Sequence, residues 1–228
     1  MSAFKLPDKQ PYHAVWSNYT GFFVINFKFI LFLLPTLVFI FSFLLFGGLI
    51  FLLLAFIGLI FAAPAVTAMY DYAYQRVQKI PEEDGRRFFD CYKETFSRSA
   101  LTMALQLPFL SMLALAMLTQ TQAPMWITAC IGLAAVMLMA FSILAFSQIA
   151  LTDLKLSEIW KNAVVFIPLT GWRTVVMALG QIICIAMFLP LTMVMLTLFI
   201  LSGPAVLLGL TAGTLFPNLK DLLPGEIG

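Results

Sequence analysis

FILFLLPTLVFIFSFLLFGGLIFLLLAFIGLIFAAPAVTAMY, residues 29 to 70, is a stretch of 42 residues without a charged side chain. A bilayer core of about 30 Å needs about 20 helical residues to cross, so the stretch is long enough for two crossings. Gly47 and Gly48 stand near its middle, and glycine suits a tight turn because it tolerates positive φ. The sequence therefore predicts two membrane-spanning helices joined at this glycine pair.

Two further charge-free segments, residues 99 to 152 and 174 to 219, contain 54 and 46 residues. Each again has room for two crossings, which gives six transmembrane helices arranged as three hairpins. The polar run from Thr119 to Pro124 marks the turn of the second hairpin. In the third, both Pro190 and the Ser202-Gly203-Pro204 cluster are candidate turns, and we favour Pro190 because it places the repeated Pro-Ala-Val at matching depth.

Charged residues occur only between and outside these segments, in Lys5 to Lys28, Asp71 to Arg98, Asp153 to Arg173 and Lys220 to Glu226. Because each hairpin returns the chain to its starting side, all 13 Lys and Arg residues fall on one face. The positive-inside rule makes that face cytoplasmic, so both termini are expected there and the protein in the cell membrane. With 62% hydrophobic and 11% charged residues, we expect a single polytopic membrane domain over residues 1–228, with lipid bilayer as its surroundings.

A stretch with helical apolar spacing precedes each hairpin and suggests three repeat units, 12–70, 86–152 and 154–219. Each unit would be a cytoplasmic amphipathic helix followed by two spans. Such a helix lies in the headgroup plane or packs beneath the bundle, and the sequence leaves both open. The expected apolar stripes are Tyr12, Val15, Trp16, Tyr19, Phe22 and Phe23 in the first unit, Phe89, Tyr92 and Phe96 in the second, and Leu156, Ile159, Trp160, Ala163 and Val164 in the third.

Catalytic and cofactor motifs are missing from the sequence. It contains no P-loop, no His-Glu-x-x-His stretch and no Gly-x-Ser-x-Gly elbow, and His13 is its only histidine. The charge-free segments also contain no ionisable group of the kind that builds ion paths and proton relays. We therefore expect no enzymatic activity, no cofactor, no metal site and no nucleic-acid partner.

Three glutamines are the strongest polar signal inside the predicted spans: Gln106, Gln148 and Gln181. Gln106 follows Arg98 by eight residues and Gln181 follows Arg173 by eight, so both are expected about 12 Å from the charged boundary. One interpretation is that these amides bond across helices, and the other is that they line a polar cavity for a solute.

Two weaker signals concern contacts. Gly209 and Gly213 have the Gly-x-x-x-Gly spacing that lets helices approach closely, within the bundle or between two copies. The connection between the first and second hairpins has mixed charges, which fit a solvated turn or a docking site for a cytoplasmic partner. The candidate docking residues are Glu82, Glu83, Asp84, Arg86 and Arg87.

Three stretches carry a resemblance to a known family: Ala63 to Tyr70 with its small residues and proline, Phe88 to Phe96 with its paired aromatics and Lys-Glu pair, and Leu156 to Ala163. With these three stretches, in this order and at this separation, the chain resembles the YesL family of bacterial membrane proteins. That family is described as a domain of unknown function. The resemblance covers roughly residues 15 to 215. It implies a multi-pass cell-membrane protein whose relatives often accompany carbohydrate-uptake systems, and it supplies no catalytic or binding residues.

The sequence thus leads to two functional hypotheses. The first is a non-enzymatic accessory membrane protein that contacts a transporter subunit or another membrane protein and is associated with a carbohydrate-uptake system. The alternative is a small permease or solute-binding membrane component whose polar cavity is lined by Gln106, Gln148 and Gln181.

Overall fold

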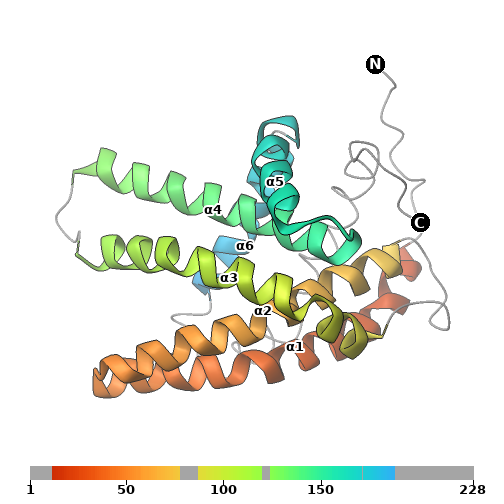
Figure 1. Cartoon of the computed structure of the whole chain (residues 1–228), viewed down its shortest axis with the longest axis horizontal. Coiled ribbons are helices and arrows are strands. Elements are labelled where there is room, and N and C mark those ends of the chain that lie inside the picture. The colour runs from red at the N-terminus through yellow and green to blue at the C-terminus, as the bar shows by residue number, and fades with distance from the viewer. Residues whose placement is uncertain (1–11, 78–86, 120–123, 171, 188–228) are drawn as a thin grey trace.

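The fold is all-helical in the part of the chain that the computed structural model describes, residues 12–77, 87–119, 124–170 and 172–187. Six helices follow one another there, with no strand between them: α1 Tyr12–Phe46, α2 Leu49–Val77, α3 Phe88–Thr119, α4 Met125–Leu151, α5 Leu156–Thr170 and α6 Trp172–Met187. In Figure 1, α1 and α2 lie side by side, α3 and α4 run alongside each other, and α5 crosses α4 steeply.

Two of these helices are long and apolar enough to cross a membrane, the segments Leu49–Gln75 in α2 and Met125–Leu151 in α4. A third crossing is reached if the bent pair of α5 and α6 counts as one span, and α1 contributes the shorter apolar segment Phe27–Phe43. These lengths and compositions suit association with a membrane. Residues 188–219, with the preferred turn at Pro190 and the Gly209 and Gly213 pair, lie outside the described residues.

The joint between α1 and α2 is at the glycine pair. α1 ends at Phe46, α2 begins at Leu49, and Gly47 has φ +68°, a backbone conformation that other residues adopt only at a cost. The helices pack closely along their length, and Gly58 of α2 faces Thr36 of α1. α1 runs unbroken through Pro35 and α2 through Pro64, which membrane helices tolerate because neighbouring groups satisfy the freed carbonyls.

The interior of the helical bundle combines small and polar side chains with large apolar ones such as Met69, Ile143 and Leu144, and many further large apolar side chains lie on the outer surface. On α2 the buried residues include Ala62, Ala63, Ala65 and Ala68, and on α4 all eight residues from Ile143 to Ala150 are buried. Outward-facing residues include Phe41, Leu45, Leu49, Ile50, Phe109, Met112, Leu115 and Leu133. Small residues at helix contacts with apolar residues on the outer surface are typical of membrane bundles, because lipid solvates the outside.

The expectation of three separate amphipathic helices is wrong for the first two units. The stretch from Tyr12 is continuous with the apolar part of α1, and the stretch from Phe88 is continuous with the rest of α3. No sequence signal strong enough to end a helix separates the polar and apolar parts of either one. Only the third unit has a separate helix, α5, which contains Pro168 near its end.

The buried face of α3 also differs from the predicted one. Phe88, Cys91 and Thr95 are buried, while Phe89 is half exposed and Tyr92 and Phe96 are half-buried. The predicted stripe followed the aromatic side chains, but α3 turns its smaller residues toward α2 because these allow the two helices to approach. Arg98 contacts Thr152, the residue that follows α4.

Candidate functional site

A line of polar side chains runs along the inner face of α3. Cys91, Thr95, Ser99, Thr102 and Gln106 repeat at intervals of four, four, three and four, which places them on one helical face, and all five are buried. The Thr95 hydroxyl donates to the Cys91 carbonyl at 2.8 Å, and the Thr102 hydroxyl donates to the Arg98 carbonyl at 2.8 Å. We call these five residues the α3 polar face.

The α3 polar face meets α2 at a pair of hydroxyls. Thr67 Oγ1 and Ser99 Oγ lie 2.7 Å apart, and both side chains are fully buried. Thr67 Oγ1 also lies 3.3 Å from the Ala63 carbonyl oxygen of its own helix. Thr67 can therefore donate within α2 and accept from Ser99, which satisfies both hydroxyl groups.

Gln106 joins α3 to α4. Its Oε1 lies 2.8 Å from Ser142 Oγ, and the same Ser142 oxygen lies 2.8 Å from the Leu138 carbonyl oxygen. A hydroxyl has one proton, so Ser142 donates to one of these acceptors only. The other amide atom of Gln106, Nε2, is buried and has no hydrogen-bond partner among the described residues.

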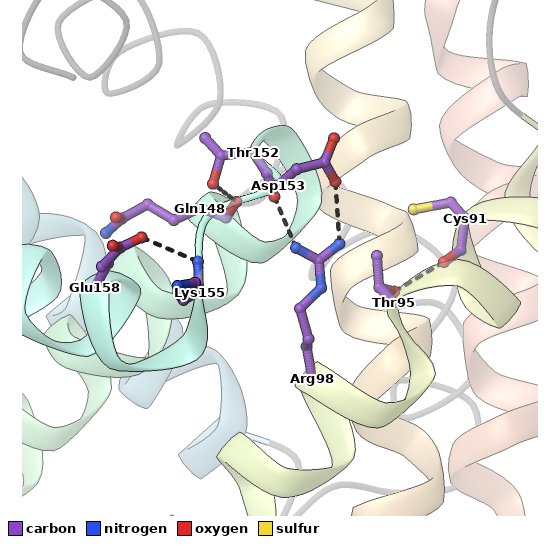
Figure 2. A network of polar contacts seen from close by, with 8 residues as sticks. All are labelled: Cys91, Thr95, Arg98, Gln148, Thr152, Asp153, Lys155 and Glu158. Atoms are coloured by element: carbon purple, nitrogen blue, oxygen red, sulfur yellow. Dashed lines mark hydrogen bonds and ion pairs between the residues drawn. The ribbon is translucent and has the colours of Figure 1, made fainter. Parts of the chain in front are cut away.

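Gln148 bonds to its own helix. Its Nε2 donates to the Leu144 carbonyl at 3.1 Å, and its Oε1 is buried without a partner among the described residues. Figure 2 shows the Gln148 side chain extending away from Arg98. Gln148 therefore does not share the contact that joins α3 to the end of α4.

Gln181 connects α6 to α2, because its Nε2 lies 3.4 Å from the buried Tyr70 hydroxyl. The three predicted glutamines thus take part in three different contacts: α3 with α4, α4 with itself, and α6 with α2. The hydrogen bonds do not bring them together at one point, and each amide bonds a neighbouring helix or its own turn.

Asp71 is the first charged residue after the predicted membrane segment that ends at residue 70. It is only 4% exposed and lies within the apolar segment Leu49–Gln75, where Gln75 Nε2 donates to Asp71 Oδ2 at 2.9 Å. Asp71 is thus a buried ionisable group of α2, one residue beyond the charge-free segment that ends at Tyr70. The Asp-x-x-x-Gln spacing, which puts both side chains on one helical face, was the available signal.

Arg98 fixes the end of α4 and the loop that follows it. Its guanidinium donates to the Thr152 carbonyl at 3.0 Å and lies 3.5 Å from the fully exposed carboxylate of Asp153 (Figure 2). A basic group at the last carbonyls of a helix satisfies acceptors that have no partner within the helix. Just beyond, the Lys155 backbone N–H donates to Glu158 at 3.1 Å and caps the start of α5.

Aromatic rings join α1 to the start of α3. Phe32 stacks on Tyr92 with ring centroids 4.5 Å apart, and Lys28 Nζ lies 5.9 Å from the Phe88 centroid and 5.6 Å from that of Phe89. The Tyr92 hydroxyl donates to the Phe61 carbonyl of α2 at 3.1 Å. Burial raises the pKa of Tyr92, so the phenol keeps the proton that it donates at neutral pH.

Of the candidate docking residues, the structure describes only Arg87, which is exposed and precedes α3. Its carbonyl accepts from the backbone N–H groups of Asp90 and Cys91, so it caps the helix. Glu82, Glu83, Asp84 and Arg86 lie outside the described residues. Across the described ranges, no three His, Cys, Asp or Glu side chains gather closely enough to hold a metal ion.

Comparisons with family models, with curated proteins and with solved structures find no match to this chain. The resemblance to the YesL family therefore stays a prediction.

Proposed function

We propose that the protein is a non-enzymatic accessory component of the cell membrane that binds a transporter subunit or another membrane protein. In this proposal the chain crosses the membrane six times, with its basic loops and both termini in the cytoplasm. The link to carbohydrate uptake rests on the resemblance to the YesL family.

One observation supports this proposal above the alternative: buried polar groups are used to join helices. Thr67 bonds Ser99 between α2 and α3, Ser142 contacts Gln106 between α4 and α3, and Gln181 bonds Tyr70 between α6 and α2. Interhelical hydrogen bonds of this kind hold membrane bundles together. A bundle fixed in this way suits a protein that presents its outer surface and loops to a partner.

Extraction of the tagged protein in a mild detergent tests the proposal. A transporter subunit should co-purify in stoichiometric amount, and combined reversal of Glu82, Glu83 and Asp84 to lysine should reduce its recovery. Lys93→Glu, at an exposed position on α3, is the matched control and should leave recovery unchanged. A protein that purifies alone under all mild conditions would contradict the proposal.

A small permease or solute-binding component is the second candidate, and a separate observation favours it. Gln106 Nε2 and Gln148 Oε1 are buried and lack hydrogen-bond partners within the described ranges, and such groups are expensive to leave unpaired. Uptake of mono- and disaccharides into vesicles containing the purified protein would test it. Transport that is lost in Gln106→Leu and Gln148→Leu, with the fold retained, would favour the permease.

A further inference from the structure

In the third unit, the exposed side of α5 changes from polar to apolar along the helix. Ile159, Ala163 and Phe166 of α5 repeat at four and three residues, are buried and form the face that packs on the bundle. On the opposite side, the exposed residues before Asn162 are polar or charged: Ser157, Glu158 and Lys161. Those after it are apolar: Val164 is 60% exposed, Val165 54% and Leu169 61%.

The position of α5 along α4 sets its depth. The Trp160 ring packs edge-on against Phe141 with centroids 5.9 Å apart. Phe141 precedes the end of α4 at Leu151 by ten residues, which is about 15 Å along the helix. Since α4 is one of the two membrane-length helices, α5 lies beside its inner half and not beneath its end.

The surroundings of α4 agree with this depth. Ile143 to Ala150 are buried without interruption, so neighbouring helices cover that part of α4 on every side. α2, α3, α5 and α6 all contact α4. A helix that covers the inner half of a membrane span lies itself at the level of the inner leaflet.

We infer that α5 is a tilted, lipid-embedded helix that enters the inner leaflet from the cytoplasmic surface. Its polar first half stays at the surface beside the exposed Asp153 and Lys155, and Val164, Val165 and Leu169 contact acyl chains. Amphipathic helices at a membrane surface bury their apolar residues to a depth of about 5–10 Å. The inference rests on the proposed membrane crossing by α4.

The break between α5 and α6 fits this placement. The segments Leu156–Leu169 and Thr174–Ile182 meet at 103°, so the chain turns sharply after the apolar half of α5. Trp172, 72% exposed, begins α6, and tryptophan is enriched at the level where headgroups meet acyl chains. We therefore place Trp172 at that level.

Nitroxide labels test the inference in vesicles of phosphatidylethanolamine and phosphatidylglycerol. Single cysteines would replace Ser157, Glu158, Lys161, Val164, Val165 and Leu169 in a chain whose three native cysteines are changed to serine. All six positions are exposed, so the labels need no space inside the bundle. Labels at Val164, Val165 and Leu169 should be severalfold more accessible to oxygen than to a water-soluble nickel chelate, and labels at the other three should show the reverse order.

Leu133→Cys on α4 separates failure of this inference from failure of the membrane assignment, because Leu133 is 64% exposed on a proposed span. If Leu133 favours oxygen while Val164, Val165 and Leu169 favour the nickel chelate, α5 lies in water and the inference is wrong. Low accessibility to both reagents at these three positions would also overturn it, because a protein surface or a second copy would then cover them. Nickel accessibility at Leu133 itself would contradict the proposed crossing.

Discussion

A Cβ atom at Gly58 would lie 2.5 Å from Thr36 Oγ1 and 3.2 Å from the Thr36 Cα atom. The absence of a side chain at position 58 is therefore what allows α2 to approach α1 at this level. The Thr36 hydroxyl oxygen is buried and has no hydrogen-bond partner among the described residues. It faces the Gly58 Cα–H, the kind of weak contact that recurs where membrane helices cross closely.

Substitution of Gly58 should destabilise the protein. Overpacking of a tight contact costs about 1–3 kcal/mol, which exceeds the gain of about 0.5–1 kcal/mol from replacing a helical glycine by alanine. Gly58→Ala should therefore lower the stability measured by unfolding in sodium dodecyl sulfate, and Gly58→Leu should lower it further.

Gly132 on α4 is the matched control, since a Cβ there meets no atom within 4 Å. Gly132→Ala should leave stability unchanged or raise it slightly. Equal effects of alanine at positions 58 and 132 would show that the helices do not cross at Gly58.

The hydroxyl pair between α2 and α3 should contribute measurably to stability. Thr67→Val and Ser99→Ala should each cost about 0.6 kcal/mol and at most about 1.7 kcal/mol, the range found for hydrogen bonds between membrane helices. Thr67→Val should be the more costly. In Ser99→Ala, the Thr67 hydroxyl still donates a hydrogen bond to the Ala63 carbonyl. The double variant should lose less than the sum of the single variants, and strictly additive losses would mean that the two hydroxyls do not interact.

Loss of the Arg98 side chain should destabilise the protein more than loss of its ion pair with Asp153. Arg98→Met leaves the Thr152 carbonyl without its donor and should cost about 1 kcal/mol. Asp153→Asn removes only a fully exposed partner at 3.5 Å, so we expect no measurable loss because solvent screens the pair. Unfolding curves of the two variants measure both losses of stability. A larger loss of stability in Asp153→Asn would show that the ion pair, and not the hydrogen bond to Thr152, is the stabilising contact.

Charge and apolar length predicted where some of the described helices begin and end better than they predicted which helices contact one another. The turn between α1 and α2 is at the predicted Gly47 and Gly48, and α4 begins directly after the predicted Pro124. These positions depend on local backbone preferences, which a sequence carries within a few residues. The six-span arrangement stays a prediction.

Packing partners were harder to predict. The contacts of Gln106 with Ser142 and of Gln181 with Tyr70 cannot be read from the sequence. The two pairs are separated by 36 and 111 positions and meet only through the arrangement of the helices. The sequence places Asp71 just outside the charge-free segment, whereas its burial in α2, which continues to Val77, depends on contacts that the sequence does not show. On α3 the aromatic spacing indicates one face, whereas the smaller residues of another face meet α2.

Labelling of a single cysteine at Gln122, in a chain without the native cysteines, tests the proposed membrane topology most directly. Gln122 belongs to the connection between the two helices of the second hairpin, which the account places on the extracellular side. A thiol reagent that cannot cross the membrane should modify it in intact cells, whereas a cysteine at Glu158 should react only after the cells are opened. Modification of Gln122→Cys solely from the cytoplasmic side would contradict the account.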